Sequence, residues 1–316
     1  MFDCIIMLQM KQAALKALEN LRSAGNIPFV WHSMEELECK TNDFVSRFLD
    51  ERLKVSKELG GGFFLTELLD RLMRTSESER MDDRRLPEIE KLELVKALDR
   101  QNEMLRLYPR YVAMLLSLLD DAIKGGEPVA RVLELACGSG GLAIALAEEV
   151  QRKNLAVSVT GSDIIPIYIE EGNRLAAEKK LPLSFRRLNA YDLTEFSANS
   201  FDLMVLSQSL HHFTPGQLAV MIAQSAKCTK TAFVGIDGYR SILLAGGVPL
   251  IASMQGIASF ALDGFTSARK FYSEAELDII AEIATGKKNH SITSSWPLTV
   301  LTIRFDGIKP DAPQFP

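Results

Sequence analysis

The spacing of apolar residues divides the chain into an all-helical first part and a second part in which short strands alternate with helices. In the first part, apolar residues recur at the period of a helix. The pattern predicts five helices, which run over residues 8–24, from Ser33 to Gly60, around 64–72, from Pro87 to 107, and from Pro109 to Gly125. The polar stretch Arg74–Arg85 lies among them and predicts a solvated linker or an exposed loop.

From Ala130 onward, short apolar runs alternate with helical patterns, an order typical of a parallel sheet with helices on both faces. The first strand is predicted at the apolar run of Val132, Leu133 and Leu135, and further strands are predicted over residues 157–161, 183–188, 201–206, 231–236, 291–295 and 298–305. We therefore divide the chain into a helical extension over 1–107, an α/β domain over 108–306 and a polar tail over 307–316. The extension is expected to cap the domain or to form a homodimer face, and a chain beginning near Pro87 is expected to stay folded.

The segment Ser241–Leu262 carries no charged residue and approaches the length of a membrane span. Because it lies between strands of one predicted sheet, we expect buried or pocket-covering helices there and no span. The stretch Gly246–Pro249 predicts a bend between two short pieces. The apolar residues of the segment either line a pocket or pack in the core, and both alternatives stay open for Leu243, Leu244, Leu250, Ile251, Met254 and Phe260.

Composition narrows the classes of partner. The formal net charge is -5 and no basic tract stands out, which argues against a nucleic acid. The four cysteines form no C-x-x-C pair, and the four histidines complete no zinc pattern. Asp3 stands where a signal peptide needs positive charge. We expect a reduced, cytoplasmic chain without a metal site.

A glycine turn follows the first predicted strand and opens a helix, which is the arrangement of many nucleotide sites. Gly138, Gly140 and Ala143 fit the dinucleotide fingerprint G-x-G-x-x-G/A, so an enzyme that uses NAD is one interpretation. Glu134 favours an interpretation other than an NAD site. It places a carboxylate inside the strand, where a dinucleotide-binding strand usually stays apolar.

The stretch from Glu134 to Gly140, ELACGSG, resembles the first motif of class I S-adenosylmethionine-dependent methyltransferases, D/E-x-G-x-G-x-G. Ala136 is its one departure, at a position where glycine is usual. The resemblance implies a Rossmann-like sheet of seven strands in the order 3-2-1-4-5-7-6, with the seventh strand antiparallel. It also implies that S-adenosylmethionine is the cofactor and that it is held by Glu134, Ala136, Gly138, Ser139 and Gly140.

Polar residues after the second and third strands extend this resemblance. Asp163 ends the second strand, where a carboxylate can accept hydrogen bonds from both ribose hydroxyls, although it can also cap the next helix. Ile164 would then lie against the adenine. Asn189 and Ala190 open a stretch similar to the family's D-A-x-x-L, and the amide oxygen of Asn189 would read the adenine amino group.

The fourth predicted strand and the loop after it read SFDLMVLSQSLHHF, which is similar to a motif of small-molecule methyltransferases. Ser207 and Gln208 end the strand and are expected to face the cofactor. His211 and His212 follow at the mouth of the site, where an imidazole can take a proton from a nucleophile or can simply pack against the next helix. Asp237 ends the fifth strand at the same edge and either contacts the acceptor or turns the chain.

These observations predict transfer of a methyl group to a small-molecule acceptor, with apolar surface if the uncharged segment lines a pocket. The tetrapeptide N/D-P-P-Y/F, which methyltransferases of exocyclic and amide nitrogens commonly use, is absent after the fourth strand. An NAD-dependent oxidoreductase and a non-catalytic S-adenosylmethionine-binding protein remain the alternatives. The sequence leaves open the acceptor and the kind of atom that is methylated.

Overall fold

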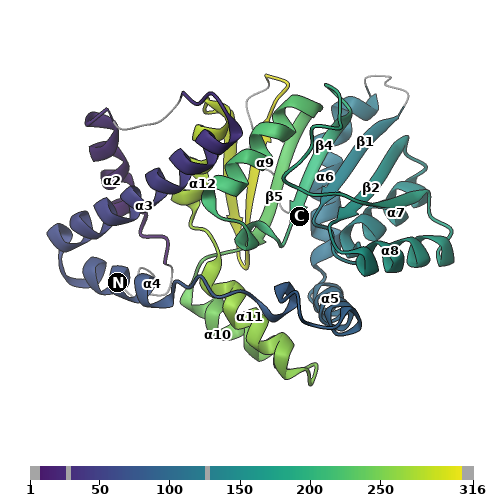
Figure 1. The fold of residues 1–316 in the computed structure, drawn as a ribbon, viewed down its shortest axis with the longest axis horizontal. Coiled ribbons are helices and arrows are strands. Elements are labelled where there is room, and N and C mark those ends of the chain that lie inside the picture. The colour runs from purple at the N-terminus through teal and green to yellow at the C-terminus, as the bar shows by residue number, and fades with distance from the viewer. Residues whose placement is uncertain (1–7, 26–29, 125–128, 308–316) are drawn as a thin grey trace.

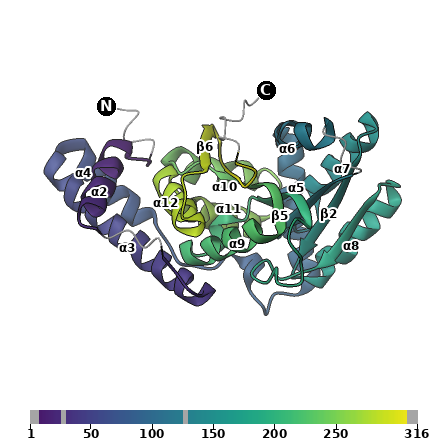
Figure 2. The ribbon, with the colours of Figure 1, turned by 90° about the horizontal axis from the view of Figure 1, so that it is seen from above.

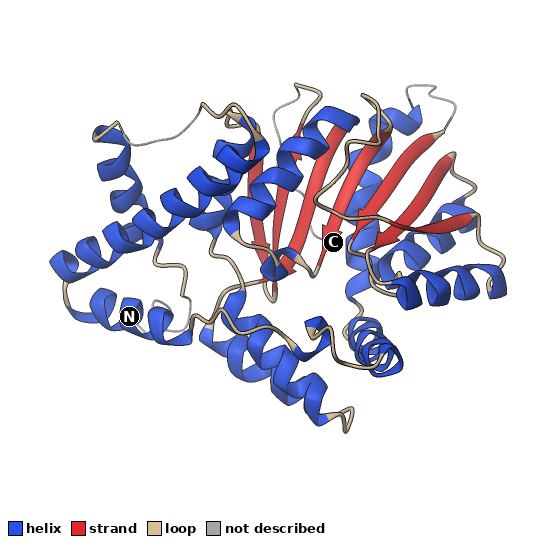
Figure 3. Cartoon of the chain, viewed as in Figure 1, coloured by secondary structure: helices blue, strands red, loops and turns tan. Residues whose placement is uncertain are grey.

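The computed structural model describes residues 8–25, 30–124 and 129–307 of the 316-residue chain. A seven-stranded sheet runs through the molecule, with helices on both of its faces (Figures 1 and 3). The strands are β1 (Ala130–Leu135), β2 (Val157–Asp163), β3 (Leu183–Arg187), β4 (Phe201–Ser207), β5 (Thr229–Gly238), β6 (His290–Ser295) and β7 (Leu298–Arg304).

The order of the strands is β3-β2-β1-β4-β5-β7-β6, as the resemblance implied. Strands β1 to β5 pair in parallel, and β7 pairs antiparallel with both β5 and β6. The carboxyl ends of the parallel strands therefore lie at one edge of the sheet, which is where open α/β sheets bind their ligands.

Alternate residues of β1, β4, β5 and β7 enter two different cores. In β4, Leu203 and Val205 pack on one face with helices α6, α7 and α8, while Met204 and Leu206 pack on the other with α9 and α12. The described helices are α2 (Lys11–Ser23), α3 (Met34–Leu59), α4 (Gly61–Met73), η1 (Arg80–Asp82), α5 (Glu88–Met104), α6 (Leu107–Lys124), α7 (Gly141–Lys153), α8 (Pro166–Glu178), η2 (Leu210–His212), α9 (Pro215–Cys228), α10 (Ile242–Ser253), α11 (Ala258–Lys270) and α12 (Glu274–Thr285).

The helical extension shares its core with the α/β domain. Helices α2, α3 and α4 gather at one end of the molecule beside α12, opposite α7 and α8 (Figure 2). Apolar residues of α2 and α3 belong to the same buried cluster as those of α9 and α12. Asp70 of α4 accepts a hydrogen bond of 2.6 Å from Arg240, which follows β5. The extension thus packs as one layer of the fold.

Two details differ from the sequence predictions. Helix α6 begins at Leu107, two residues before Pro109, because proline is tolerated in the first turn, where its missing N–H has no intrahelical partner. Helix α10 continues through Gly246–Pro249, and the break falls at residues 254–257. Among the described residues, no helix is long and apolar enough to cross a membrane. The two glycines expected to close α6 lie outside the described residues.

Candidate functional site

Two adjoining cavities open at the carboxyl edge of the sheet, below which α5, α10 and α11 lie together (Figure 1). The first, which we name the acidic cavity, has a volume of about 460 Å³ and contacts the ends of β1, β2 and β4. The second, the apolar cavity, has a volume of about 280 Å³ and lies between α5, α10, α11 and the end of β5. Both volumes are comparable to those of small-molecule sites.

The glycine turn has the backbone that its sequence requires. Gly138 and Gly140 have φ angles of 56° and 86°, which lie in the left-handed region that glycine adopts without strain. Ala136 has a φ of 48°, so the residue that departs from the family motif adopts the conformation for which glycine is usual. The turn geometry is therefore preserved at the cost of some backbone strain at Ala136.

Four carboxylates line the acidic cavity, from Asp82, Asp99, Glu134 and Asp163. Among the described residues that line it, there is no lysine or arginine. Such a lining can neutralise a cationic ligand, and it offers no positive charge to a phosphate group. Its charge therefore favours a ligand with ammonium and sulfonium groups over a dinucleotide.

Glu134 is the most deeply buried of these acids, with 3% of its surface exposed. Its Oε1 accepts a hydrogen bond of 2.7 Å from the Ser207 hydroxyl, while its buried Oε2 has no hydrogen-bond partner. Burial raises the pKa of this carboxyl to about 8. An unpartnered carboxylate oxygen of this kind fits a cationic group of a ligand, which would supply the missing partner.

Asp163 stands at the rim of the same cavity and fixes the glycine turn. Its Oδ2 accepts a hydrogen bond of 2.9 Å from the Gly138 amide, and its Oδ1 accepts one of 3.0 Å from the Ile165 amide. Burial raises the pKa of the carboxyl. The N-cap residue of α8 is Ile165, so Asp163 precedes the cap position. Each oxygen retains a lone pair for a ligand hydroxyl, and the half-exposed Ile164 lies beside it in the cavity wall.

The other predicted cofactor residues are divided between the cavity wall and its surroundings. Ala136, Gly138, Ser207 and Gln208 line the acidic cavity together with Glu134, Asp163 and Ile164. The remaining four, Ser139, Gly140, Asn189 and Ala190, are not among its lining residues.

Two of these four have partners of their own. Ser139 donates a hydrogen bond of 2.5 Å to Asp99. Asn189 is exposed and accepts a hydrogen bond from the Tyr191 amide, and Tyr191 is the residue of this loop that reaches the cavity. The adenine-reading role of Asn189 stays a prediction.

The apolar cavity takes most of its wall from the uncharged segment and the helices around it. Of the six residues for which both alternatives stayed open, Leu244, Ile251 and Phe260 line the cavity. The other three, Leu243, Leu250 and Met254, are exposed and lie outside it. The apolar lining residues in full are Met81, Leu98, Leu105, Leu107, Leu244, Val248, Ile251, Ala252, Phe260, Phe271, Trp296, Pro297 and Leu298. An acceptor held here would bury apolar surface.

Five residues line both cavities and form the partition between them: Met81, Leu98, Asn102, Gln208 and His212. A ligand in the acidic cavity and one in the apolar cavity would meet at this partition. The arrangement can bring a group donor and a group acceptor into contact.

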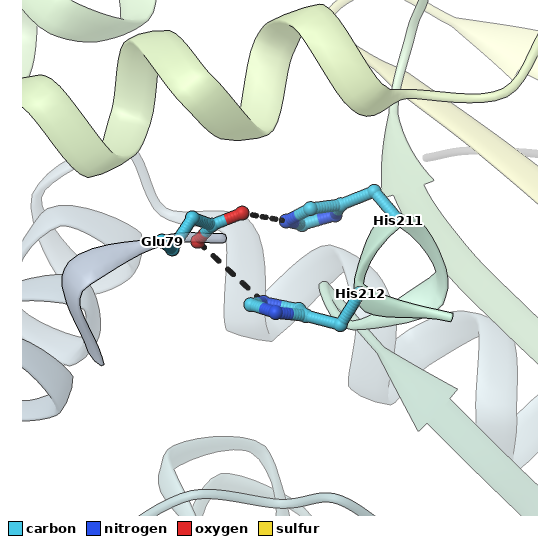
Figure 4. A group of neighbouring side chains, drawn as sticks. All are labelled: Glu79, His211 and His212. Atoms are coloured by element: carbon cyan, nitrogen blue, oxygen red, sulfur yellow. Dashed lines mark ion pairs between the residues drawn. The ribbon is translucent and has the colours of Figure 1, made fainter. Parts of the chain in front are cut away.

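His212 belongs to the partition and His211 lies beside it, and both side chains face Glu79 (Figure 4). The Nδ1 atom of His211 is 2.8 Å from Asp237 Oδ2, and its Nε2 atom is 3.3 Å from Glu79 Oε1. Burial alone lowers the pKa of His211, but the carboxylates of Asp237 and Glu79 raise it to about 10.

The stretch Arg74–Arg85 was predicted to be a solvated linker or an exposed loop, and this prediction is wrong at Glu79, whose side chain is buried. This residue is 2% exposed, because its segment crosses the site and is fixed by Asp263, whose carboxylate accepts hydrogen bonds from the Arg80 and Met81 amides. No feature of the polar stretch distinguishes Glu79 from its neighbours. Asn102 was also missed, but it carried a signal, since it lies at helical spacing from Val95 and Leu98 on an otherwise apolar face of α5.

Comparisons with known proteins give a family match over part of the chain and a solved structure of similar fold. Residues 132–232 match the family model described as a methyltransferase domain. The solved structure of the plantazolicin methyltransferase BpumL in complex with SAH has a TM-score of 0.53 and 11% identity, and the match covers 83% of this chain and 99% of that one. Magnesium protoporphyrin IX methyltransferase ChlM from Synechocystis PCC 6803 with bound SAH has a TM-score of 0.42 and 19% identity, over 66% of this chain and 83% of that one. A search of curated proteins found no match.

Proposed function

We propose that this chain is a class I S-adenosylmethionine-dependent methyltransferase and that it transfers the methyl group of the cofactor to a small molecule whose body is largely apolar. The cofactor supplies an already activated sulfonium methyl group, so the protein need only bind, align and shield the reactants. The chain provides two adjoining cavities for these two reactants.

The charge of the acidic cavity is the observation that carries this proposal. S-adenosylmethionine has a sulfonium and an ammonium group but no phosphate, and the four lining carboxylates suit such a ligand. Glu134, with its unpartnered Oε2, would hold a cationic group of the cofactor. Asp163 would hold the ribose hydroxyls. An NAD-dependent oxidoreductase is disfavoured, because the pyrophosphate of bound NAD would face these carboxylates.

The acceptor is proposed from the apolar cavity. Leu244, Ile251 and Phe260 offer apolar contacts, while the polar atoms of Asn102 and Gln208 lie at the partition, where methyl transfer would occur. Since the net charge is -5 and there is no basic tract, a small molecule in the cytoplasm is favoured over nucleic acid. His211 and His212 both line the apolar cavity, so we place them in the acceptor site.

The helical extension is proposed to act as a cap on the acceptor side, through η1 and α5, which contribute Met81, Leu98 and Asn102 to the partition. Helix α4 has an exposed row of leucines, Leu65, Leu68 and Leu72, and this is the part of the extension that would accept a second copy of the chain. Light scattering with size exclusion tests the homodimer, and Leu68→Glu is expected to leave a monomer.

A product assay tests the proposed function. The full chain is incubated with methyl-labelled S-adenosylmethionine and a metabolite pool, and mass spectrometry identifies labelled products together with S-adenosylhomocysteine. Asp163→Ala should bind the cofactor about ten- to a hundredfold more weakly, because it loses charge-assisted hydrogen bonds to the ribose. Asp192→Ala is the matched control, since Asp192 is an exposed turn acid on the next loop. Cofactor binding without any labelled product would favour a non-catalytic binding protein.

A further inference from the structure

Two histidines and one glutamate meet at the wall of the apolar cavity, from segments far apart in the chain (Figure 4). The rings of His211 and His212 lie side by side, with centroids 4.4 Å apart, and the Nε2 atoms of both approach the carboxylate of Glu79. The donor atoms of the three side chains all lie within 4.8 Å of one another.

A carboxylate holds the other nitrogen of each histidine. Asp237 Oδ2 lies 2.8 Å from Nδ1 of His211, and Asp82 Oδ2 lies 2.9 Å from Nδ1 of His212. Histidines that bind metals commonly donate their second N–H to a carboxylate, which fixes the ring and raises its basicity as a ligand. Both imidazoles are therefore oriented with Nε2 toward the same point.

The distances between donors also suit one small cation. Nε2 of His211 lies 3.3 Å from Glu79 Oε1, and Nε2 of His212 lies 3.6 Å from Glu79 Oε2. Ligands bound tetrahedrally at about 2.1 Å from a zinc ion lie about 3.4 Å apart. The Nε2 atom of the buried His211 has no hydrogen-bond partner, so the contact with Glu79 is a close approach without directional bonding.

We propose that Glu79, His211 and His212 bind a divalent transition-metal cation such as Zn²⁺. Two imidazoles and a carboxylate are a donor set typical of such ions, and a site with only three protein ligands leaves a coordination position open. That position faces the apolar cavity. Lys270, whose Nζ lies 3.3 Å from Glu79 Oε1, is the cationic partner of Glu79 in the metal-free site.

The site suggests the chemical class of the acceptor, and this step rests on the proposed methyltransferase function. An acceptor hydroxyl or carboxylate oxygen would take the open position, and coordination lowers the pKa of a hydroxyl. As the O–C bond forms, the C–S bond breaks, the sulfur keeps the electron pair, and the hydroxyl proton leaves to solvent. The two histidines then act through the metal and are not themselves proton acceptors.

Cobalt titration of the full chain tests the site. After treatment with a chelator, the wild-type protein should bind about one equivalent of Co²⁺, with a visible absorption band that Zn²⁺ abolishes. Glu79→Gln and His212→Gln should lose this band at the same cobalt concentration, while their circular dichroism stays near wild type. Glu79 does not line the acidic cavity, so Glu79→Gln should also keep its affinity for S-adenosylmethionine. His32→Gln, at an exposed histidine outside the cluster, should keep the band.

Absence of the band in the wild type, or a band that persists in Glu79→Gln and His212→Gln, would overturn the metal site. Product formation that survives complete removal of the metal would overturn its role in binding the acceptor oxygen. Failure of the methyltransferase proposal is distinguishable, because cobalt would then bind as described although no labelled product forms with any acceptor.

Discussion

Asn102 and Gln208 hold each other by two side-chain hydrogen bonds across the partition of the site. Nδ2 of Asn102 donates to Oε1 of Gln208 at 2.8 Å, and Nε2 of Gln208 donates to Oδ1 of Asn102 at 2.9 Å. Gln208 also donates to the Tyr111 hydroxyl at 3.0 Å. The pair joins helix α5 to the end of β4, so it sets the distance between the two cavities.

Asn102→Ala should therefore slow methyl transfer more than it weakens cofactor binding. The change leaves Gln208 with unsatisfied polar atoms, which costs about 1–3 kcal/mol of stability. We expect roughly a tenfold fall in kcat and a smaller change in cofactor Kd. Glu103→Ala, on the exposed face of the same helix, is the control. Equal losses in kcat and in cofactor affinity would argue against a positioning role for the pair.

Glu134→Gln should alter the pH dependence of stability in the cofactor-free protein. The pKa of Glu134 in the folded protein is about 8, above its ordinary value of 4.5. The contribution of Glu134 to the free energy of unfolding is therefore fully present below pH 4.5 and is lost as the pH rises through about 8. The glutamine variant lacks this loss, which is on the order of a few kcal/mol.

Urea unfolding at about pH 5 and about pH 8 checks this prediction. The variant should gain stability relative to the wild type at the higher pH, and it should bind S-adenosylmethionine more weakly because it cannot become an anion. A wild-type-to-variant difference that is the same at both pH values would contradict the assignment.

Ala136→Gly should stabilise the protein slightly. Alanine at a φ of 48° carries left-handed strain that glycine does not, although glycine also makes the unfolded chain more flexible. We expect a net gain of up to about 1 kcal/mol in thermal unfolding. Ala145→Gly, inside helix α7, should instead lose about 1 kcal/mol. Equal losses at the two positions would show that Ala136 is unstrained.

Ile251→Lys should impair acceptor turnover with little change in cofactor affinity, because Ile251 lines the apolar cavity. Met254→Lys is its matched control on the next turn, since Met254 is 75% exposed and lies outside that cavity. Turnover and calorimetry of both variants provide the measurement. If Met254→Lys were as damaged as Ile251→Lys, general disruption of α10 would explain both, and the acceptor would lose its proposed site.

A chain that begins near Pro87 should fail to fold, contrary to the expectation from sequence alone. This shortened chain lacks helices α2 to α4. Their loss exposes part of the shared core and leaves the buried Arg240 without its partner Asp70. Breaking a buried ion pair of this kind costs about 3–5 kcal/mol, so Asp70→Asn in the full chain should also lower the Tm strongly. Circular dichroism and thermal unfolding decide the matter, and a cooperative native-like transition in the shortened chain would contradict the shared core.

Local and periodic signals made most of the fold predictable. The alternation of strands and helices after Ala130 gave the sheet, and the motif around Gly138 gave its strand order and the cofactor edge. Asp163 and Glu134, which line the acidic cavity, could be singled out because a strand end and a strand interior are recognisable positions. Glu79 was not, because its burial depends on contacts with Asp263 and the histidines, which are remote in sequence.

The prediction of a bend at Gly246–Pro249 was wrong for a similar reason. Gly246 and Pro249 disfavour a helix locally, but α10 packs against α11, with Val248 of α10 lying next to Gly264 of α11, and this tertiary packing outweighs local propensity. The actual break at residues 254–257 includes Gly256, whose φ is 72°.

Calorimetric titration of the purified full chain with S-adenosylmethionine and, separately, with NAD tests the central claim most directly. The account predicts saturable one-site binding of S-adenosylmethionine that Asp163→Ala weakens about ten- to a hundredfold, and no binding of NAD at the same concentrations. Binding of NAD without binding of S-adenosylmethionine would contradict it, because a phosphate-bearing ligand would then occupy a cavity lined by four carboxylates.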